Sequence, residues 1–207
     1  MIPRAKKNLH ECEYHLKKMV SSRNVEELEI NFAAFVNSAR NVTFVLKKEF
    51  INHPQYKKTF LTWYGDLDSP EAGTKSHEMS SDDLCIFFKK LRNSILKEGI
   101  NGIVCNTHIE SFNSSTDLPD KPPNASIQIS SRGIYYLINK GTTQEDSIPA
   151  RTTARITTSV FIADPPNKHL DQAIPNNQKD IFNLSNKYYE YLKSVVDEWT
   201  GILNNSK

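Results

Sequence analysis

The sequence predicts an α+β fold: an N-terminal helical bundle of about four helices, a small antiparallel sheet, and a C-terminal helix packed back on the bundle. Apolar residues recur at three- and four-residue steps through the first hundred residues and again after residue 180, as on one face of a helix. Between residues 101 and 163 the period shortens towards two, and β-branched and aromatic residues become frequent. We therefore divide the chain into a helical bundle (1–100), a β region (101–175) and a terminal helix (176–207) that forms one compact unit with the bundle.

The long helix predicted over residues 28–50 is the clearest element of the chain. Its apolar stripe is long enough to pack against two or three neighbours. The stripe consists of Leu28, Phe32, Phe35, Ala39, Val42, Leu46 and Phe50. A first helix starts near Pro3, where the missing N–H costs nothing, and Asn24 is one of three polar residues that offer the long helix a cap. The long helix ends before Pro54, since the residue preceding a proline avoids the helical conformation.

A further helix is predicted in the second half of the bundle. Residues 65–79 contain two glycines, a proline and mixed charges, which predicts an exposed loop. Ser80 then has the character of an N-cap, with Asp83 three residues on. Gly99 stands where helices commonly end. Between them lies the stripe of Leu84, Phe87, Phe88, Leu91 and Ile95.

The β region and the last helix complete the predicted fold. Strands are predicted over residues 103–112, 125–131, 133–139 and 153–163, whereas 140–149 has the composition of a loop. We expect three or four of these strands in one antiparallel sheet. The stripe of the last helix contains Ile181, Leu184, Tyr188, Tyr191, Val195, Trp199 and Ile202. Such large side chains must be covered, either by the bundle or by a second copy of the chain in a dimer.

Composition excludes several classes of protein. Lys and Arg number 26 against 24 acids, so the net charge of +2 excludes a generally basic nucleic-acid coat and an acidic disordered tail. The chain has no long apolar run and no apolar leader, which predicts no membrane span and a cytoplasmic protein. The three cysteines lack metal-site spacing, so we expect reduced thiols and no metal. Phosphate-binding and dinucleotide-binding glycine motifs are absent, and we expect no cofactor.

One segment, residues 87–99 (FFKKLRNSILKEG), points to a function. It is basic and aromatic, and an Arg-Asn pair lies late in its helix. Its candidate functional residues are Lys89, Lys90, Arg92, Asn93 and Lys97. The segment resembles the signature of HEPN-domain proteins, helical bundles with an Arg-x4–6-His motif and usually a polar residue after the arginine. The long helix around residues 32–44 is similar to the first long helix of such bundles, so the resemblance covers about the first hundred residues.

The resemblance implies chemistry on RNA. In active HEPN families two motifs meet across a dimer and cleave RNA without a metal, the arginine holding the scissile phosphate and the histidine transferring protons. The histidine would fall at position 97, 98 or 99, where this chain has Lys97, Glu98 and Gly99. Lysine, with an ordinary pKa of about 10.4, is a poor general base but can neutralise a phosphate. Arg92 and Asn93 therefore carry over as catalytic candidates with Lys97 as a substitute for the histidine, and Lys89 and Lys90 as RNA contacts.

Three functions fit these residues. The first, which we favour, is a HEPN-like protein with a degenerate motif that binds RNA or a protein partner, as a homodimer, in a toxin, defence or regulatory setting. The second is an active metal-independent endoribonuclease. The third is a protein-interaction module without a nucleic-acid role. A structural role also explains Arg92 and Asn93, since arginine suits the dipole at the end of a helix and asparagine can bond the last carbonyls.

A second cluster lies on a predicted strand. His108 and Glu110 alternate there, with Cys105 nearby, so they could form an acid–base pair. Such a pair needs a third, orienting group, and the local spacing supplies none. An exposed polar face of the strand explains the same residues.

Overall fold

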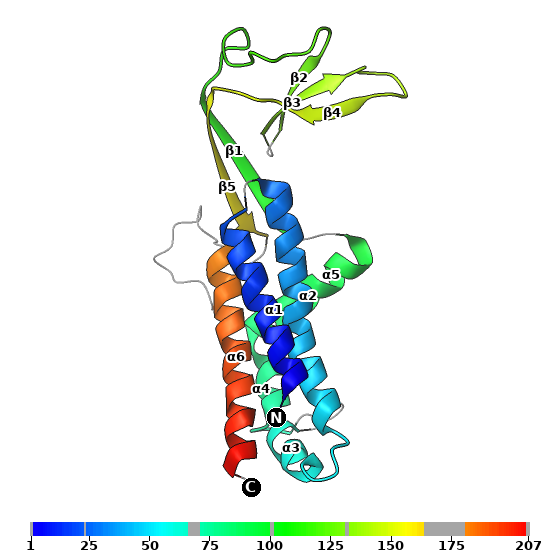
Figure 1. Ribbon diagram of the computed structural model, residues 1–207, viewed down its shortest axis with the longest axis vertical. Coiled ribbons are helices and arrows are strands. Elements are labelled where there is room, and N and C mark those ends of the chain that lie inside the picture. Colours follow the sequence, from blue (N-terminus) through cyan, green and yellow to red (C-terminus); the bar gives the residue numbers. More distant parts are fainter. Residues whose placement is uncertain are drawn as a thin grey trace. The chain divides into compact units, whose positions relative to one another are not determined.

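The computed structural model describes residues 2–22, 24–65, 71–99, 102–130, 133–163 and 181–205. The chain divides into two compact units, drawn in Figure 1. The helical unit comprises residues 1–102 and 162–207, and the β unit comprises residues 103–161. The predicted α+β fold, with a helical N-terminal part, a small antiparallel sheet and a C-terminal helix, is confirmed. Within the described residues, no helix has the length and apolar character needed to cross a membrane.

Two long helices lie side by side in the helical unit, α1 (Pro3–Val20) and α2 (Val25–Phe50) (Figure 1). Pro3 occupies the first turn of α1. Asn24 caps α2, because its side chain accepts a hydrogen bond of 2.8 Å from the backbone N–H of Glu27. Every residue of the predicted stripe on α2 is buried, so the spacing alone located the core face of this helix.

Three shorter helices follow: α3 (Lys57–Tyr64), α4 (Lys75–Ser81) and α5 (Asp83–Glu98). The predicted loop over 65–79 is therefore wrong from residue 75 onwards, and Ser80 lies inside α4 instead of capping α5. The cap is Asp82, whose carboxylate accepts from the N–H of Cys85 at 2.9 Å. A seven-residue helix such as α4 has too few residues for an apolar stripe, so packing against the other helices decides its conformation.

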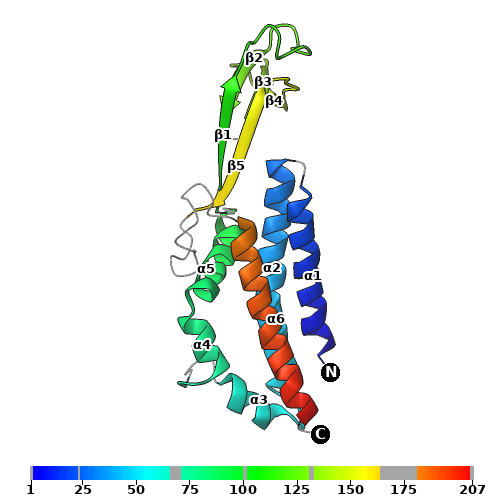
Figure 2. The ribbon, with the colours of Figure 1, turned by 90° about the vertical axis from the view of Figure 1, so that its left-hand side faces the viewer.

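The last helix, α6 (Ile181–Asn205), packs on the bundle against α1, α2 and α5, as predicted (Figure 2). Trp199 is fully buried, with its ring centroid 5.0 Å from that of Phe50 and 5.1 Å from that of Phe60. One and a half turns before the middle of α6, Tyr188 stacks on Phe88 at 4.3 Å. The core of the bundle thus joins residues from the two ends of the chain.

The β unit contains two sheets, which corrects the expectation of a single one. In the first, β1 (Ile103–Ser111) pairs with β5 (Arg155–Ile162). In the second, β2 (Ser126–Ser130), β3 (Gly133–Ile138) and β4 (Asp146–Pro149) form an antiparallel sheet in that order. The last of these strands lies within the predicted loop 140–149. It is exposed along its whole length, so its sequence shows no apolar alternation that would predict a strand. It ends in proline, which is tolerated because β4 is at the edge of the sheet.

The chain leaves and re-enters the helical unit at one place. The backbone N–H of Ala163 donates to the carbonyl of Gly102 at 2.8 Å. Gly102 has a φ of +67°, which favours glycine, and a Cβ there would lie 2.7 Å from Cδ1 of Leu91, so the end of that side chain would have to shift. The two ends of the β unit are therefore adjacent.

Candidate functional site

Helix α5 presents the residues that the sequence analysis singled out. Leu84, Phe88 and Leu91 are buried and fix the helix against the bundle. Its end is fixed by Gly99, which has a left-handed φ of +68° and donates its N–H to the carbonyls of Ile95 and Ser94. The candidate residues lie on the outward side of α5: Lys89, Lys90, Asn93 and Lys97 are exposed and Arg92 is half-buried.

Arg92 is in an unusual state. Its Nε is removed from solvent and has no hydrogen-bond partner, and no ion pair of Arg92 occurs among the residues that the structure describes. A buried donor without an acceptor is costly, and the guanidinium is always charged. A salt bridge of Arg92 inside its own bundle therefore finds no support in the described part of the chain. Because the side chain as a whole is only half-buried, the part of the guanidinium that reaches solvent can meet an acceptor from elsewhere.

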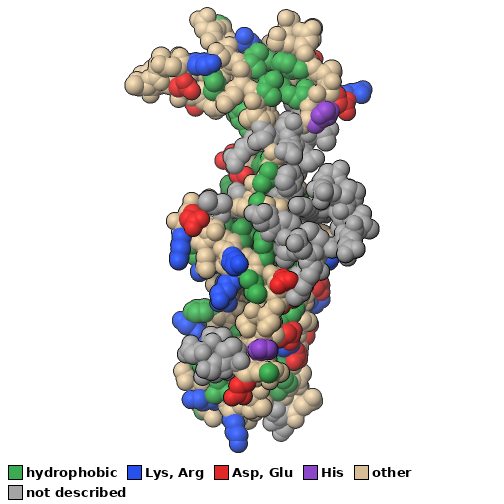
Figure 3. Space-filling model, turned by 180° about the vertical axis from the view of Figure 1, so that it is seen from behind, with side chains coloured by type: hydrophobic (Ala, Val, Ile, Leu, Met, Phe, Trp, Pro, Cys, Tyr) green, Lys and Arg blue, Asp and Glu red, His purple; other side chains and the backbone are tan. Residues whose placement is uncertain are grey.

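The surroundings of Arg92 are basic. From Leu84 to Lys97 the helix contains no Asp or Glu. Helical spacing places Lys89 and Arg92 on one face, and Lys90, Asn93 and Lys97 on the next. Figure 3 shows Lys and Arg side chains gathered over the side of the bundle where α5 lies. We call these five residues, Lys89, Lys90, Arg92, Asn93 and Lys97, the α5 surface.

A cavity of about 120 Å³ lies next to this helix, within the helical unit. Its wall includes three cationic side chains, Arg40 and Lys47 of α2 and Lys89 of α5. No Asp or Glu is part of the wall. We call this cavity the basic pocket. The sequence analysis missed it, because its residues come from α2, α3, α4, α5 and α6; the sequence signal was the spacing of Arg40, Thr43 and Lys47 on one face of α2.

The titratable groups of the basic pocket are set to donate hydrogen bonds, not to accept protons. Burial raises the pKa of Tyr64 and of Tyr188, against the smaller opposing effect of the Arg40 charge. Burial, and next the charge of Asp82, raises the pKa of the Cys85 thiol. At neutral pH these side chains are a phenol, a phenol and a thiol, so none supplies a general base or a thiolate nucleophile. The pocket is suited to binding.

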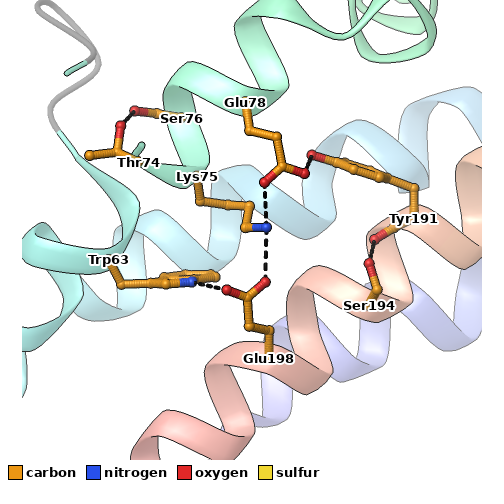
Figure 4. A network of polar contacts seen from close by, with 8 residues as sticks. All are labelled: Trp63, Thr74, Lys75, Ser76, Glu78, Tyr191, Ser194 and Glu198. Carbon is orange, nitrogen blue, oxygen red and sulfur yellow. Dashed lines mark hydrogen bonds and ion pairs between the residues drawn. The ribbon is translucent and has the colours of Figure 1, made fainter. Parts of the chain in front are cut away.

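A polar network beside the basic pocket holds α4 against α6 (Figure 4). The ammonium group of Lys75 lies 2.6 Å from Glu78 and 2.9 Å from Glu198. Trp63 donates to Glu198 at 2.6 Å, and the Tyr191 hydroxyl donates to Glu78 at 3.1 Å. Because α4 also contributes side chains to the pocket wall, this network positions one side of the pocket.

The second predicted cluster is not brought together as an acid–base pair. His108 and Glu110 are exposed on β1, and Cys105 is buried. The contact of Glu110 is an ion pair of 3.8 Å with Arg155 of β5. Among the described residues there is also no group of three or more His, Cys, Asp or Glu that could hold a metal ion.

In comparisons with protein-family models, with curated proteins and with solved structures, nothing matches this chain. The α5 surface and the basic pocket are therefore the features from which a function is argued.

Proposed function

We propose that this chain is a HEPN-like protein with a degenerate motif, which binds RNA through the α5 surface and does not cleave it. The observation that carries the proposal is the state of Arg92. Among the described residues its Nε is buried without an acceptor, and the helix has no Asp or Glu from Leu84 to Lys97.

Phosphodiester oxygens would satisfy this surface. A guanidinium binds a phosphate through two parallel hydrogen bonds, which fixes the orientation of the backbone as well as adding affinity. The exposed Lys89, Lys90 and Lys97 would neutralise neighbouring phosphates and release their counterions. The exposed amide of Asn93 can both donate and accept, so it can contact a ribose hydroxyl or a base edge.

The same surface lacks what cleavage requires. Metal-independent cleavage needs a group that takes a proton from the 2′-hydroxyl and one that gives a proton to the leaving oxygen. Helix α5 contains no histidine. At the positions of the motif histidine stand Lys97 and Glu98, both exposed, and Gly99, which is the cap of the helix. A charged lysine donates hydrogen bonds but accepts none. The surface therefore favours binding over catalysis.

The proposal can be tested by titrating a fluorescently labelled single-stranded RNA with the full chain, without metal, at several salt concentrations. Arg92→Ala is expected to weaken binding by about tenfold or more, as for the loss of one charge-assisted contact. Lys90→Ala and Lys97→Ala are each expected to reduce the slope of log affinity against log salt by about 0.7. Lys7→Ala, which removes one exposed charge from α1, is the matched control and should change affinity little.

The same samples, analysed on denaturing gels, separate the alternatives. Cleavage in the presence of a chelator that is lost in Arg92→Ala would establish an active ribonuclease instead of a degenerate one. Absence of both binding and cleavage at micromolar protein would refute a role in RNA binding and leave the protein-interaction module. Arg92→Lys keeps the charge without the planar fork, and an intermediate affinity would support two-point contact with a phosphate.

A further inference from the structure

We propose that the basic pocket is a second binding site, for the phosphate group of a small phosphorylated molecule. It is lined by Arg40, Thr43, Phe44, Lys47, Tyr64, Ser76, Met79, Ser80, Cys85, Lys89 and Tyr188. The ligand is a small molecule in a partly enclosed space, and its binding does not depend on RNA binding at the α5 surface.

The charge of the wall selects an anion. Arg40, Lys47 and Lys89 contribute three positive charges, and none of them has an ion pair among the residues that the structure describes. Two acidic groups on elements that line the pocket are already engaged: Glu78 contacts Lys75 and Tyr191, and the carboxylate of Asp82 accepts from the backbone of α5. Three cations without acidic partners in a partly enclosed space attract an anion more strongly than the same charges would in bulk water.

The donors that complete the site are preorganised. The guanidinium of Arg40 is held by a hydrogen bond from Nη1 to the hydroxyl of Thr43 at 3.1 Å, which leaves its remaining N–H groups for a ligand. Thr43, Tyr64 and Tyr188 are buried, so their positions are fixed by packing. The phenol groups of Tyr64 and Tyr188 stay protonated, because burial raises their pKa, and can donate to a phosphate oxygen.

Size limits the ligand. A cavity of about 120 Å³ accommodates several water molecules or one phosphate group, and it is far too small for a folded nucleic acid. Phe44 and Met79 add apolar surface to the wall, and the ring of Phe44 is about half exposed. An organic group attached to the phosphate can lie against these side chains, as a mononucleotide would.

The test is calorimetric titration of the full chain with inorganic phosphate, adenosine 5′-monophosphate and adenosine, at constant ionic strength. Inorganic phosphate and adenosine 5′-monophosphate are expected to bind, whereas adenosine is not expected to bind. If the mononucleotide binds more tightly than inorganic phosphate, the organic group contributes; equal affinities assign the site to phosphate itself. Binding of adenosine as tightly as of the mononucleotide would refute recognition of the phosphate.

Variants separate the pocket from general charge effects. Arg40→Met keeps an apolar stem but removes the guanidinium, and it should weaken phosphate binding by about tenfold or more, with Arg40→Lys in between. Lys6→Met is the control: Lys6 is exposed on α1 and is not part of the wall. Equal losses in Arg40→Met and Lys6→Met would overturn the proposal, as would no loss in Arg40→Met. If Arg40→Met does not fold, Lys47→Met makes the same test.

The two proposals fail separately. Arg92 is not part of the pocket wall, so Arg92→Ala should leave phosphate binding unchanged while it weakens RNA binding. Lys89 belongs to both surfaces and is left unchanged in these variants. A loss of phosphate binding in Arg92→Ala that matches the loss in Arg40→Met would contradict a separate pocket.

Discussion

Replacing Lys75 by methionine should loosen α4 from α6. The side chain of Lys75 is only 13% exposed, and its ammonium group lies between the carboxylates of Glu78 and Glu198 at 2.6 and 2.9 Å. Methionine keeps most of the buried aliphatic volume, so the variant removes the charge and leaves packing nearly intact. It also leaves two carboxylates facing each other without a cation between them.

The expected loss follows from the exposure of these groups. The side chains of Glu78 and Glu198 are 51% and 45% exposed, so solvent screens both pairs and each contributes up to about 1 kcal/mol. Loss of both pairs should lower the free energy of unfolding by about 1–2 kcal/mol. For a unit of this size the melting temperature would fall by about 2–8 °C.

The pH dependence distinguishes this explanation from lost packing. Burial would raise the pKa of Glu198, but the hydrogen bonds from Lys75 and Trp63 and the charge of Lys75 outweigh it and lower the pKa. A lowered pKa in the folded state means that this stabilisation is present above the unfolded pKa of about 4.3 and disappears as the pH falls through the folded value. Hydrogen bonds to its two glutamates, against burial, raise the pKa of Lys75, so its contribution persists up to about pH 10.

The assay is urea unfolding followed by tryptophan fluorescence. The chain has two tryptophans, Trp63 and Trp199, stacked at 5.2 Å in the helical unit, so their emission reports that unit. The difference between wild type and Lys75→Met should be constant from about pH 5 to 9 and shrink below about pH 4. Lys17→Met, which removes an exposed partner of Glu13 within α1, is the control and should have little effect. A difference as large at pH 3 as at pH 7 would refute the electrostatic reasoning.

Three further predictions concern the core and the ends of helices in the same unit. Gly99→Ala should cost about 1 kcal/mol, because Gly99 has a φ of +68° at the end of α5; an unchanged urea midpoint would contradict this. Phe88→Ala should cost about 3–5 kcal/mol, since Phe88 is buried and stacked on Tyr188, whereas Leu96→Ala, at a side chain 53% exposed, should stay within about 0.5 kcal/mol. Burial, and next the charge of Glu11, raises the pKa of Cys12 to about 12, so a thiol reagent at pH 8 should modify it only after unfolding; rapid modification of the folded chain would show that Cys12 is accessible.

The parts of the fold that could be predicted from sequence are the long helices, where the spacing of apolar residues within one helix indicates its buried face. Every residue of the stripe predicted on α2 is buried, since a long amphipathic helix has many chances to repeat its pattern, but Val36, Ser38 and Thr43, outside the stripe, are buried as well. On α6 five of the seven predicted residues are buried, including Tyr188 and Trp199, whereas Tyr191 and Ile202 are only half-buried. Leu192, Val196 and Leu203, outside the predicted stripe, are buried as well. A helix packed against three neighbours buries a wider face than one stripe.

Elements and sites that depend on tertiary contacts could not be predicted from the spacing of residues in the sequence. The short helix α4 and the exposed strand β4 have no periodicity, so their conformations depend on what they pack against or pair with. Arg92 could be selected from its sequence context, whereas the burial of its Nε could not. The basic pocket joins Arg40 to Tyr188, far apart in the sequence, and only the folded bundle brings them together.

The hydrogen bond between Gly102 and Ala163 has a consequence for how the chain folds during synthesis. Helix α6 is made after the other helices of the unit, and until then Phe50, Phe60 and Phe88 lack the aromatic partners that α6 supplies. At about 5–20 residues per second, a ribosome needs roughly 4–16 seconds for the residues between 102 and 181. If the antiparallel strands of the β unit form within that time, they bring residues 102 and 163 together, and α6 has a much shorter loop to close. Early pairing of these strands would then speed the docking of α6 on the helical core. Without it, α6 would have to close a loop made of all the residues between 102 and 181.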